Sequence, residues 1–111
     1  MDNIESLRDA IAKVFRSWEA FPSEISQFRI VGVSDTGKDR YALMHIDFDG
    51  ERSKSHLLAQ LEIRDGKIWL LTDNTEEGLA SELVQEGVPK NRIVLGFYSR
   101  SMQEMGDFAA A

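Results

Sequence analysis

The sequence predicts an α+β fold: an antiparallel meander sheet of four to five strands, with an N-terminal helix and a second helix packed on one of its faces. Three observations predict this fold. Apolar residues near the N-terminus recur at helical spacing, the middle of the chain alternates between apolar and polar residues with turn dipeptides between the runs, and a second, shorter helical pattern follows. The length of 111 residues is that of one domain, residues 1–111.

The first helix is predicted from residue 4 onward, because apolar residues fall three and four positions apart. These residues are Ile4, Leu7, Ile11, Val14, Phe15, Trp18 and Phe21. Asp2 or Asn3 is a suitable N-cap. The dipeptide Phe21-Pro22 predicts the end of the helix, because the residue before a proline disfavours helical geometry.

Four strands joined by short turns are predicted next. Residues 28–35 are rich in β-branched and aromatic side chains, and residues 41–48 alternate after a turn over residues 36–39. Asp49-Gly50 predicts a second turn, and Asp65-Gly66 predicts a tight hairpin into the strand of residues 67–71. The third strand has a single apolar face, formed by Leu57, Ala59, Leu61 and Ile63. Residues 93–97 are expected to add an extra strand or extended segment.

The stretch LLTDNTEEG, residues 70–78, gathers three carboxylates, an amide and two hydroxyls, so it resembles a catalytic or metal site. We interpret it as the start of the second helix, because Asn74 with Glu77, or Asp73 with Glu76, fits a capping box. The apolar positions of that helix are Leu79, Ala80, Leu83 and Val84, and Gly87 followed by Val88-Pro89 predicts its end. The core is expected to include Leu57, Leu61, Ile63, Leu79 and Leu83.

No other motif of the sequence indicates chemistry. There is no cysteine, no nucleophile elbow and no phosphate-binding glycine loop. His45 and His56 flank a turn, but a third ligand at a recognisable spacing is missing. We therefore predict a non-enzymatic protein with no catalytic, metal or cofactor-binding residues. The alternative is a small ligand-binding domain or enzyme that uses a groove near Trp69 and the two histidines.

The charge and hydropathy of the chain limit its partners. A net charge of −6, with lysines and arginines dispersed in small pairs, argues against strong direct binding of DNA by this protein alone. No apolar run reaches the roughly 20 residues of a membrane span, and no secretory leader is present, so we expect a cytoplasmic protein.

The C-terminal segment is the candidate contact surface for a partner. Its apolar residues are Tyr98, Met102, Met105 and Phe108, and it ends in uncharged alanines. Disordered tails are normally polar and charged, so this segment is expected to pack on the protein's own core or on another chain. Methionines and aromatic residues suit an adaptable contact surface.

The chain after its first helix also resembles a known family. Residues 65–97, DGKIWLLTDNTEEGLASELVQEGVPKNRIVLGF, together with Asp39-Arg40-Tyr41-Ala42-Leu43 and the terminal Phe108-Ala109-Ala110-Ala111, are similar to the XisI-like family of controlling factors for fdxN-element excision. Where members of that family usually carry His-Pro-Pro, this chain has Tyr98-Ser99-Arg100.

The resemblance implies a small α+β accessory factor that acts with a XisH-like companion protein and a site-specific recombinase in the excision of a DNA element. It brings no catalytic residues to carry over. Self-association is a further expectation. A deep pocket with convergent polar groups would favour the enzyme or ligand-binding alternative, whereas an exposed apolar patch near the C-terminus would favour an accessory factor that works by protein contact.

Overall fold

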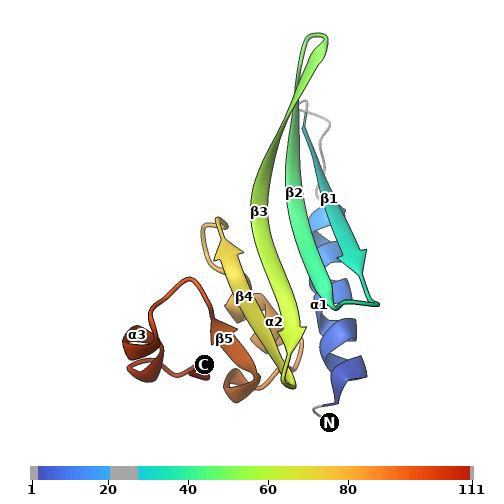
Figure 1. Ribbon diagram of the computed structural model, residues 1–111. Helices are drawn as coiled ribbons and strands as arrows, with labels where there is room; N and C mark the ends of the chain where they lie inside the picture. The colour runs from blue at the N-terminus through green and yellow to red at the C-terminus, as the bar shows by residue number, and fades with distance from the viewer. Residues whose placement is uncertain (1–2, 21–27, 111) are drawn as a thin grey trace.

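The computed structural model describes residues 3–20 and 28–110, apart from the side chain of residue 49, and it confirms the α+β fold (Figure 1). The elements in chain order are α1 (Ile4–Glu19), β1 (Phe28–Asp35), β2 (Arg40–Asp49), β3 (Arg52–Arg64), β4 (Lys67–Asp73), α2 (Leu79–Gln85), the 3-10 helix η1 (Lys90–Arg92), β5 (Ile93–Leu95) and α3 (Arg100–Glu104).

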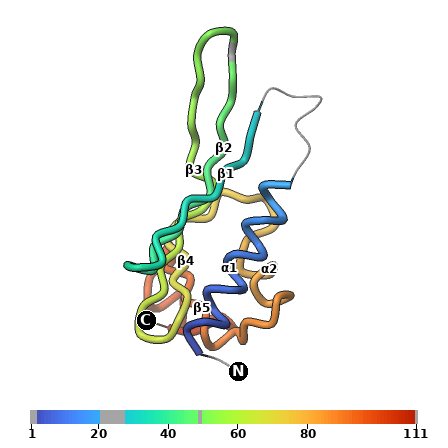
Figure 2. Tube along the Cα trace, turned by 90° about the vertical axis from the view of Figure 1, so that its right-hand side faces the viewer, coloured from blue at the N-terminus to red at the C-terminus, as the bar shows by residue number. Residues whose placement is uncertain are grey.

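The sheet has the order β1-β2-β3-β4-β5. The first four strands form the predicted antiparallel meander, and the short strand β5 adds parallel to β4. Helices α1 and α2 lie together on one face of the sheet (Figure 2). The β2–β3 hairpin extends beyond its neighbours, and the molecule measures 45 × 28 × 24 Å along its principal axes.

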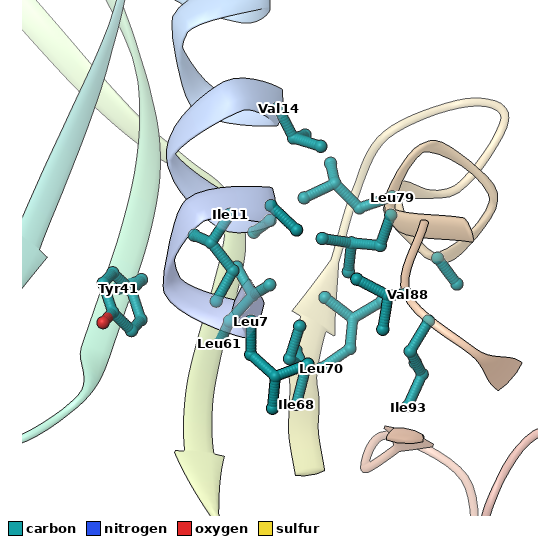
Figure 3. Packing of buried hydrophobic residues seen from close by; sticks show 14 of the residues in the cluster. Leu7, Ile11, Val14, Tyr41, Leu61, Ile68, Leu70, Leu79, Val88 and Ile93 are labelled. Atoms are coloured by element: carbon teal, nitrogen blue, oxygen red, sulfur yellow. The ribbon is translucent and has the colours of Figure 1, made fainter. Parts of the chain in front are cut away.

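The hydrophobic core lies between this sheet face and the two helices (Figure 3). Asn3 is the N-cap of α1, and its side chain accepts a hydrogen bond from the Ser6 N–H at 2.9 Å. The helix ends at Glu19, so the predicted stop at Phe21-Pro22 lies outside the described residues. The helix contributes Leu7, Ala10, Ile11, Val14 and Phe15 to the core.

The capping box predicted for the second helix is wrong. Helix α2 begins at Leu79 after Gly78, which has no side chain to cap it. Asp73 nevertheless acts on the helix from a distance, because its carboxylate accepts the Leu79 N–H at 2.7 Å and the Thr75 N–H at 3.0 Å. Asn74 donates instead to the carbonyl of Leu57 at 2.9 Å. These side chains of the polar stretch therefore hold the loop between β4 and α2.

The end of α2 agrees with the prediction. Gly87 has φ +99°, a left-handed conformation that glycine adopts without steric cost. The Val88 N–H donates to the Leu83 carbonyl at 3.0 Å, and the Gly87 N–H donates to the Val84 carbonyl at 3.0 Å. These two bonds form a Schellman motif, and they turn the chain so that Val88 is buried.

One predicted core residue lies elsewhere. Ala59, Leu61 and Ile63 of β3 are buried, but Leu57 is only half-buried. A β-bulge causes the difference, because Ala59 pairs with Leu43 while Leu57 pairs with the next residue, Met44. The extra residue shifts Leu57 to the sheet face away from the helices.

The outer edge of β1 is partly covered by α1. The Gly32 N–H points away from β2, toward the outer edge of the sheet. There it donates to the carboxylate of Glu19 at 2.9 Å. Gly32 also lies so close to the helix that an added Cβ would meet the Phe15 ring at 2.9 Å. A glycine is required here because α1 crosses the strand at this point.

Candidate protein-contact surface

Four large apolar side chains near the C-terminus are exposed. They are Phe97, Tyr98, Met102 and Met105, with exposed fractions of 44%, 43%, 53% and 86%. We call these four residues the C-terminal apolar surface. The rings of Phe97 and Tyr98 meet edge to face, with centroids 4.7 Å apart.

Short local contacts hold this surface in shape. Ser99 caps α3 by accepting the Met102 N–H at 3.4 Å. The side chain of Gln103 is buried, and its Nε2 donates to the carbonyls of Leu95 and Tyr98, both at 3.0 Å. A helix as short as α3 gains little from its own hydrogen bonds, so Gln103 is the main polar anchor that fixes it against the end of β5.

The tail after α3 returns to the sheet. The Ala109 N–H donates to the Ile93 carbonyl at 2.9 Å, and Ala109 forms a parallel bridge with Val94. Phe108 is half-buried and packs against the core. Of the four predicted partner-contact residues, Tyr98, Met102 and Met105 are therefore exposed together, while Phe108 fastens the segment to the protein's own body.

Charged pairs border the C-terminal apolar surface. The Arg100 guanidinium lies 3.3 Å from the Glu104 carboxylate, and Lys90 lies 3.8 Å from Asp107. All four side chains are largely exposed, so each pair adds little to stability. An apolar centre with a charged, hydrated rim is the usual composition of a protein-contact patch.

The alternative site near Trp69 and the histidines is not assembled. Trp69 pairs across β3 with Glu62, which pairs with Arg40 of β2. His45 lies five positions further along β2, and side chains alternate between faces, so it projects from the opposite face. Trp69 is instead covered by the Arg64 guanidinium, 3.9 Å from its ring centroid.

The two histidines do form a pair of their own. His45 and His56 are cross-strand partners, and each lies 3.6 Å from a carboxylate oxygen of Asp47. Within the described part of the chain, no group of three or more histidine, aspartate or glutamate side chains has the geometry to hold a metal ion.

The most strongly perturbed titratable groups stabilise the fold. Arg8 of α1 donates to both oxygens of Asp39, at 2.8 and 3.0 Å, and the Tyr41 hydroxyl donates to Asp39 at 2.9 Å. Hydrogen bonding from Arg8 lowers the pKa of Asp39, while burial and the bond to Asp39 raise the pKa of Tyr41 to about 12. Asp39, which also accepts the Tyr41 hydroxyl, thus attaches α1 to the β1–β2 turn.

A second perturbed carboxyl joins the two helices. Burial raises the pKa of Glu82 in α2, and the indole N–H of Trp18 donates to its two oxygens at 3.0 and 3.1 Å. The bond to Trp18 opposes this shift, whereas the charges of Asp73 and Glu77 add to it. Because Trp18 already occupies both oxygens, we assign Glu82 to helix packing.

Phe97 was predicted only as the last residue of an extra strand or extended segment over residues 93–97. Strand β5 ends at Leu95, and only the Gly96 N–H continues the ladder, at 2.8 Å from the Leu70 carbonyl. Phe97 is released to the surface beyond that point. The Gly96-Phe97 dipeptide after an apolar run was the available signal, because a glycine commonly marks the end of a strand.

The structure defines a small α+β protein that exposes an apolar patch near its C-terminus. Among the described helices, none has the length and hydrophobicity to cross a membrane. The chain belongs to the XisI family: the family model described as XisI protein matches residues 1–110.

Two solved structures from Anabaena variabilis share the fold. A XisI-like protein is 26% identical, with a TM-score of 0.80, over 94% of this chain and 95% of that one. An fdxN element excision controlling factor XisI is also 26% identical, with a TM-score of 0.72, over 96% of this chain and 97% of that one. No curated protein matches this chain.

Proposed function

We propose that this protein is a non-enzymatic controlling factor for the excision of a DNA element, and that it acts by binding another protein through the C-terminal apolar surface. Membership of the XisI family and the similarity to an fdxN element excision controlling factor support a role in the control of DNA-element excision. The observation that carries the mode of action is the cluster of Phe97, Tyr98, Met102 and Met105, which the chain holds in an ordered segment and leaves exposed.

The proposed partner is a XisH-like companion, acting with a site-specific recombinase. Aromatic and methionine side chains are enriched where proteins bind one another, because they bury a large area and adapt to the opposing surface. The net charge of −6 supports an indirect route to DNA, through the partner rather than through phosphate contacts by this chain.

Binding to the companion tests the proposal directly. Replacing Met102 and Met105 together by serine removes two exposed side chains without disturbing the core, so the melting temperature should stay within a few degrees. The affinity for the XisH-like companion, measured by isothermal titration calorimetry, should fall by at least about tenfold, as expected for the loss of apolar contacts at an interface centre.

Ile4→Ser is the matched control, because Ile4 is a comparably exposed apolar residue on α1. It should bind the companion as the parent chain does. A cell-based excision reporter should lose activity with the methionine variant and keep it with the control. Unchanged companion affinity in the methionine variant would contradict the proposed surface, and excision that proceeds normally without this protein would contradict the proposed process.

A further inference from the structure

Two methionine side chains of this protein are open to solvent. Met105 is 86% exposed, the largest exposed fraction of any large apolar side chain in the described chain, and Met102 is 53% exposed. Met44, the other methionine among the described residues, lies in β2 and is half-buried. A reagent dissolved in water therefore reaches the thioethers of Met102 and Met105 without any opening of the fold.

The two side chains belong to one fixed segment. Met102 lies in α3 and Met105 follows it by three positions, with the Met105 N–H donating to the Met102 carbonyl at 3.3 Å. Residues three apart on a helix are neighbours on its surface. Figure 1 shows α3 beyond β5, at the margin of the molecule. The bonds that anchor this segment come from Gln103 and Ala109, so a change at the methionine sulfurs leaves them in place.

Thioethers are the only sulfur groups of this chain, because it has no cysteine. A hydroperoxide therefore meets no thiol in this protein that would consume it first. Met102 and Met105 both lie outside the hydrophobic core, so their oxidation leaves the packing between the sheet and the helices α1 and α2 unchanged. Oxidation of these two side chains thus changes the surface of the protein while the fold remains.

We propose that Met102 and Met105 form an oxidation site for hydroperoxides, and that their conversion to methionine sulfoxide releases the partner protein from the C-terminal apolar surface. This control of binding rests on the proposed function, because that function makes the same surface the contact for the XisH-like companion. It adds a chemical regulation of the contact, which follows from the exposure of the two thioethers.

The reaction is the transfer of one oxygen atom to sulfur. A lone pair of the thioether sulfur attacks one oxygen of hydrogen peroxide, so that an S–O bond forms and the O–O bond breaks. Sulfur is oxidised by two electrons, and the other peroxide oxygen leaves as water after it takes the proton of the transferred oxygen. Methionine sulfoxide reductases reverse the step: two thiols supply two electrons and two protons and become a disulfide, and the sulfoxide oxygen leaves as water.

The sulfoxide changes what the surface binds. A methionine side chain is apolar and flexible, whereas a sulfoxide carries a polar oxygen. In the free protein this oxygen is hydrated at Met102 and at Met105, because both side chains are exposed. In the complex it would lose that water within an apolar contact that also contains Phe97 and Tyr98, and the lost hydration opposes binding.

Treatment of the full chain with dilute hydrogen peroxide tests whether the site is selective. Peptide mass spectrometry over time should show that Met102 and Met105 each gain one oxygen before Met44 does. The melting temperature should stay within a few degrees while they react. Oxidation of Met44 ahead of either residue, or unfolding that accompanies the oxidation of Met102 and Met105, would overturn the proposal.

Binding of the XisH-like companion, measured by isothermal titration calorimetry, tests the regulation. Conversion of both residues should raise the dissociation constant at least about tenfold. The two methionine sulfoxide reductases, one for each epimer, should restore it in the presence of a thiol. Met44→Leu is the matched control and should lose affinity on oxidation as the parent chain does. In the double variant Met102→Leu/Met105→Leu, peroxide should leave that variant's own affinity unchanged.

The outcomes separate this regulation from the proposed function. A parent chain that does not bind the companion before peroxide is added would refute both. A parent chain that binds equally well before and after full conversion, or whose affinity the reductases do not restore, would refute the regulation alone. A leucine double variant that loses affinity on oxidation as strongly as the parent chain would also refute it, because the remaining methionines would then be responsible.

Discussion

Replacing Gln103 by leucine is the sharpest test of how the C-terminal apolar surface is built. The side chain is 6% exposed, and its amide donates to two main-chain carbonyls, those of Leu95 and Tyr98, each at 3.0 Å. A hydrogen bond of this kind contributes about 1 kcal/mol net, and both bonds would be lost together, while the Leu95 carbonyl keeps its bond from the Tyr98 N–H at 3.1 Å. Leucine has a similar volume and recovers some apolar burial, so the expected loss is about 1–2 kcal/mol.

The loss should be local as well as global. For a chain of this length, 1–2 kcal/mol corresponds to a fall in melting temperature of roughly 4–8 °C. Hydrogen exchange should accelerate most at the α3 amides and at Ala109, while the amides of β2 and β3 keep their protection. Because Tyr98 and Met102 lose their common support, affinity for a partner should fall even at temperatures where the protein is folded.

Ser101→Ala is the matched control, since Ser101 lies on α3 but is exposed. It should leave the melting temperature within about 1 °C. Uniform acceleration of exchange over the whole sheet in Gln103→Leu, or full stability with unchanged exchange in α3, would refute the reasoning that Gln103 fixes this segment.

Three further predictions concern the loop, the acid limb and DNA. Asp73→Ala should destabilise the fold by about 1–2 kcal/mol in urea unfolding and Asn74→Ala by less, because only Asp73 bonds the first amide of α2; equal losses would contradict this assignment. The pKa of Asp39 is lowered on folding, so its contribution to stability is present above the ordinary pKa and is lost as pH falls through the lowered pKa of the folded state. Asp39→Asn should therefore reduce the dependence of the unfolding free energy on pH in the acid range. An unchanged dependence would contradict this role of Asp39. The isolated protein should bind duplex DNA weakly and without sequence preference in anisotropy titrations at about 0.15 M salt, whereas submicromolar selective binding would refute an accessory role of this kind.

The parts of the fold that the sequence predicted well are those governed by local interactions. The strand of residues 28–35, the hairpin at Asp65-Gly66 and the end of α2 at Gly87 each depend on neighbours within a few residues. Asn3 was one of two candidate caps, and its bond to Ser6 spans a single turn. Composition and spacing carry this information directly.

The errors share a non-local cause. The start of α2 was misplaced because its first amide is bonded by Asp73, six residues earlier, across a loop that only the folded chain forms. Leu57 was assigned to the core because the bulge in β3 depends on pairing with β2. Spacing within one segment contains neither contact, so alternation alone continued Leu57 onto the wrong face.

The C-terminal apolar surface was predicted only in part, because the position of one of its predicted residues also depends on a non-local contact. Tyr98, Met102 and Met105 stood out because apolar residues are unusual in a short terminal segment. Phe108 has the same character, yet it packs against the core because the Ala109–Ile93 bond draws the tail back to β5.

The contact between Glu19 and Gly32 has a consequence for solubility. A sheet with a bare edge strand recruits further strands, which is how ordered aggregates grow. Here the Glu19 carboxylate accepts the Gly32 N–H in the middle of β1. At the other side of the sheet, the C-terminal tail of the same chain lies along β5, where Ala109 bridges to Val94. Growth of the sheet by edge addition is therefore opposed at both margins.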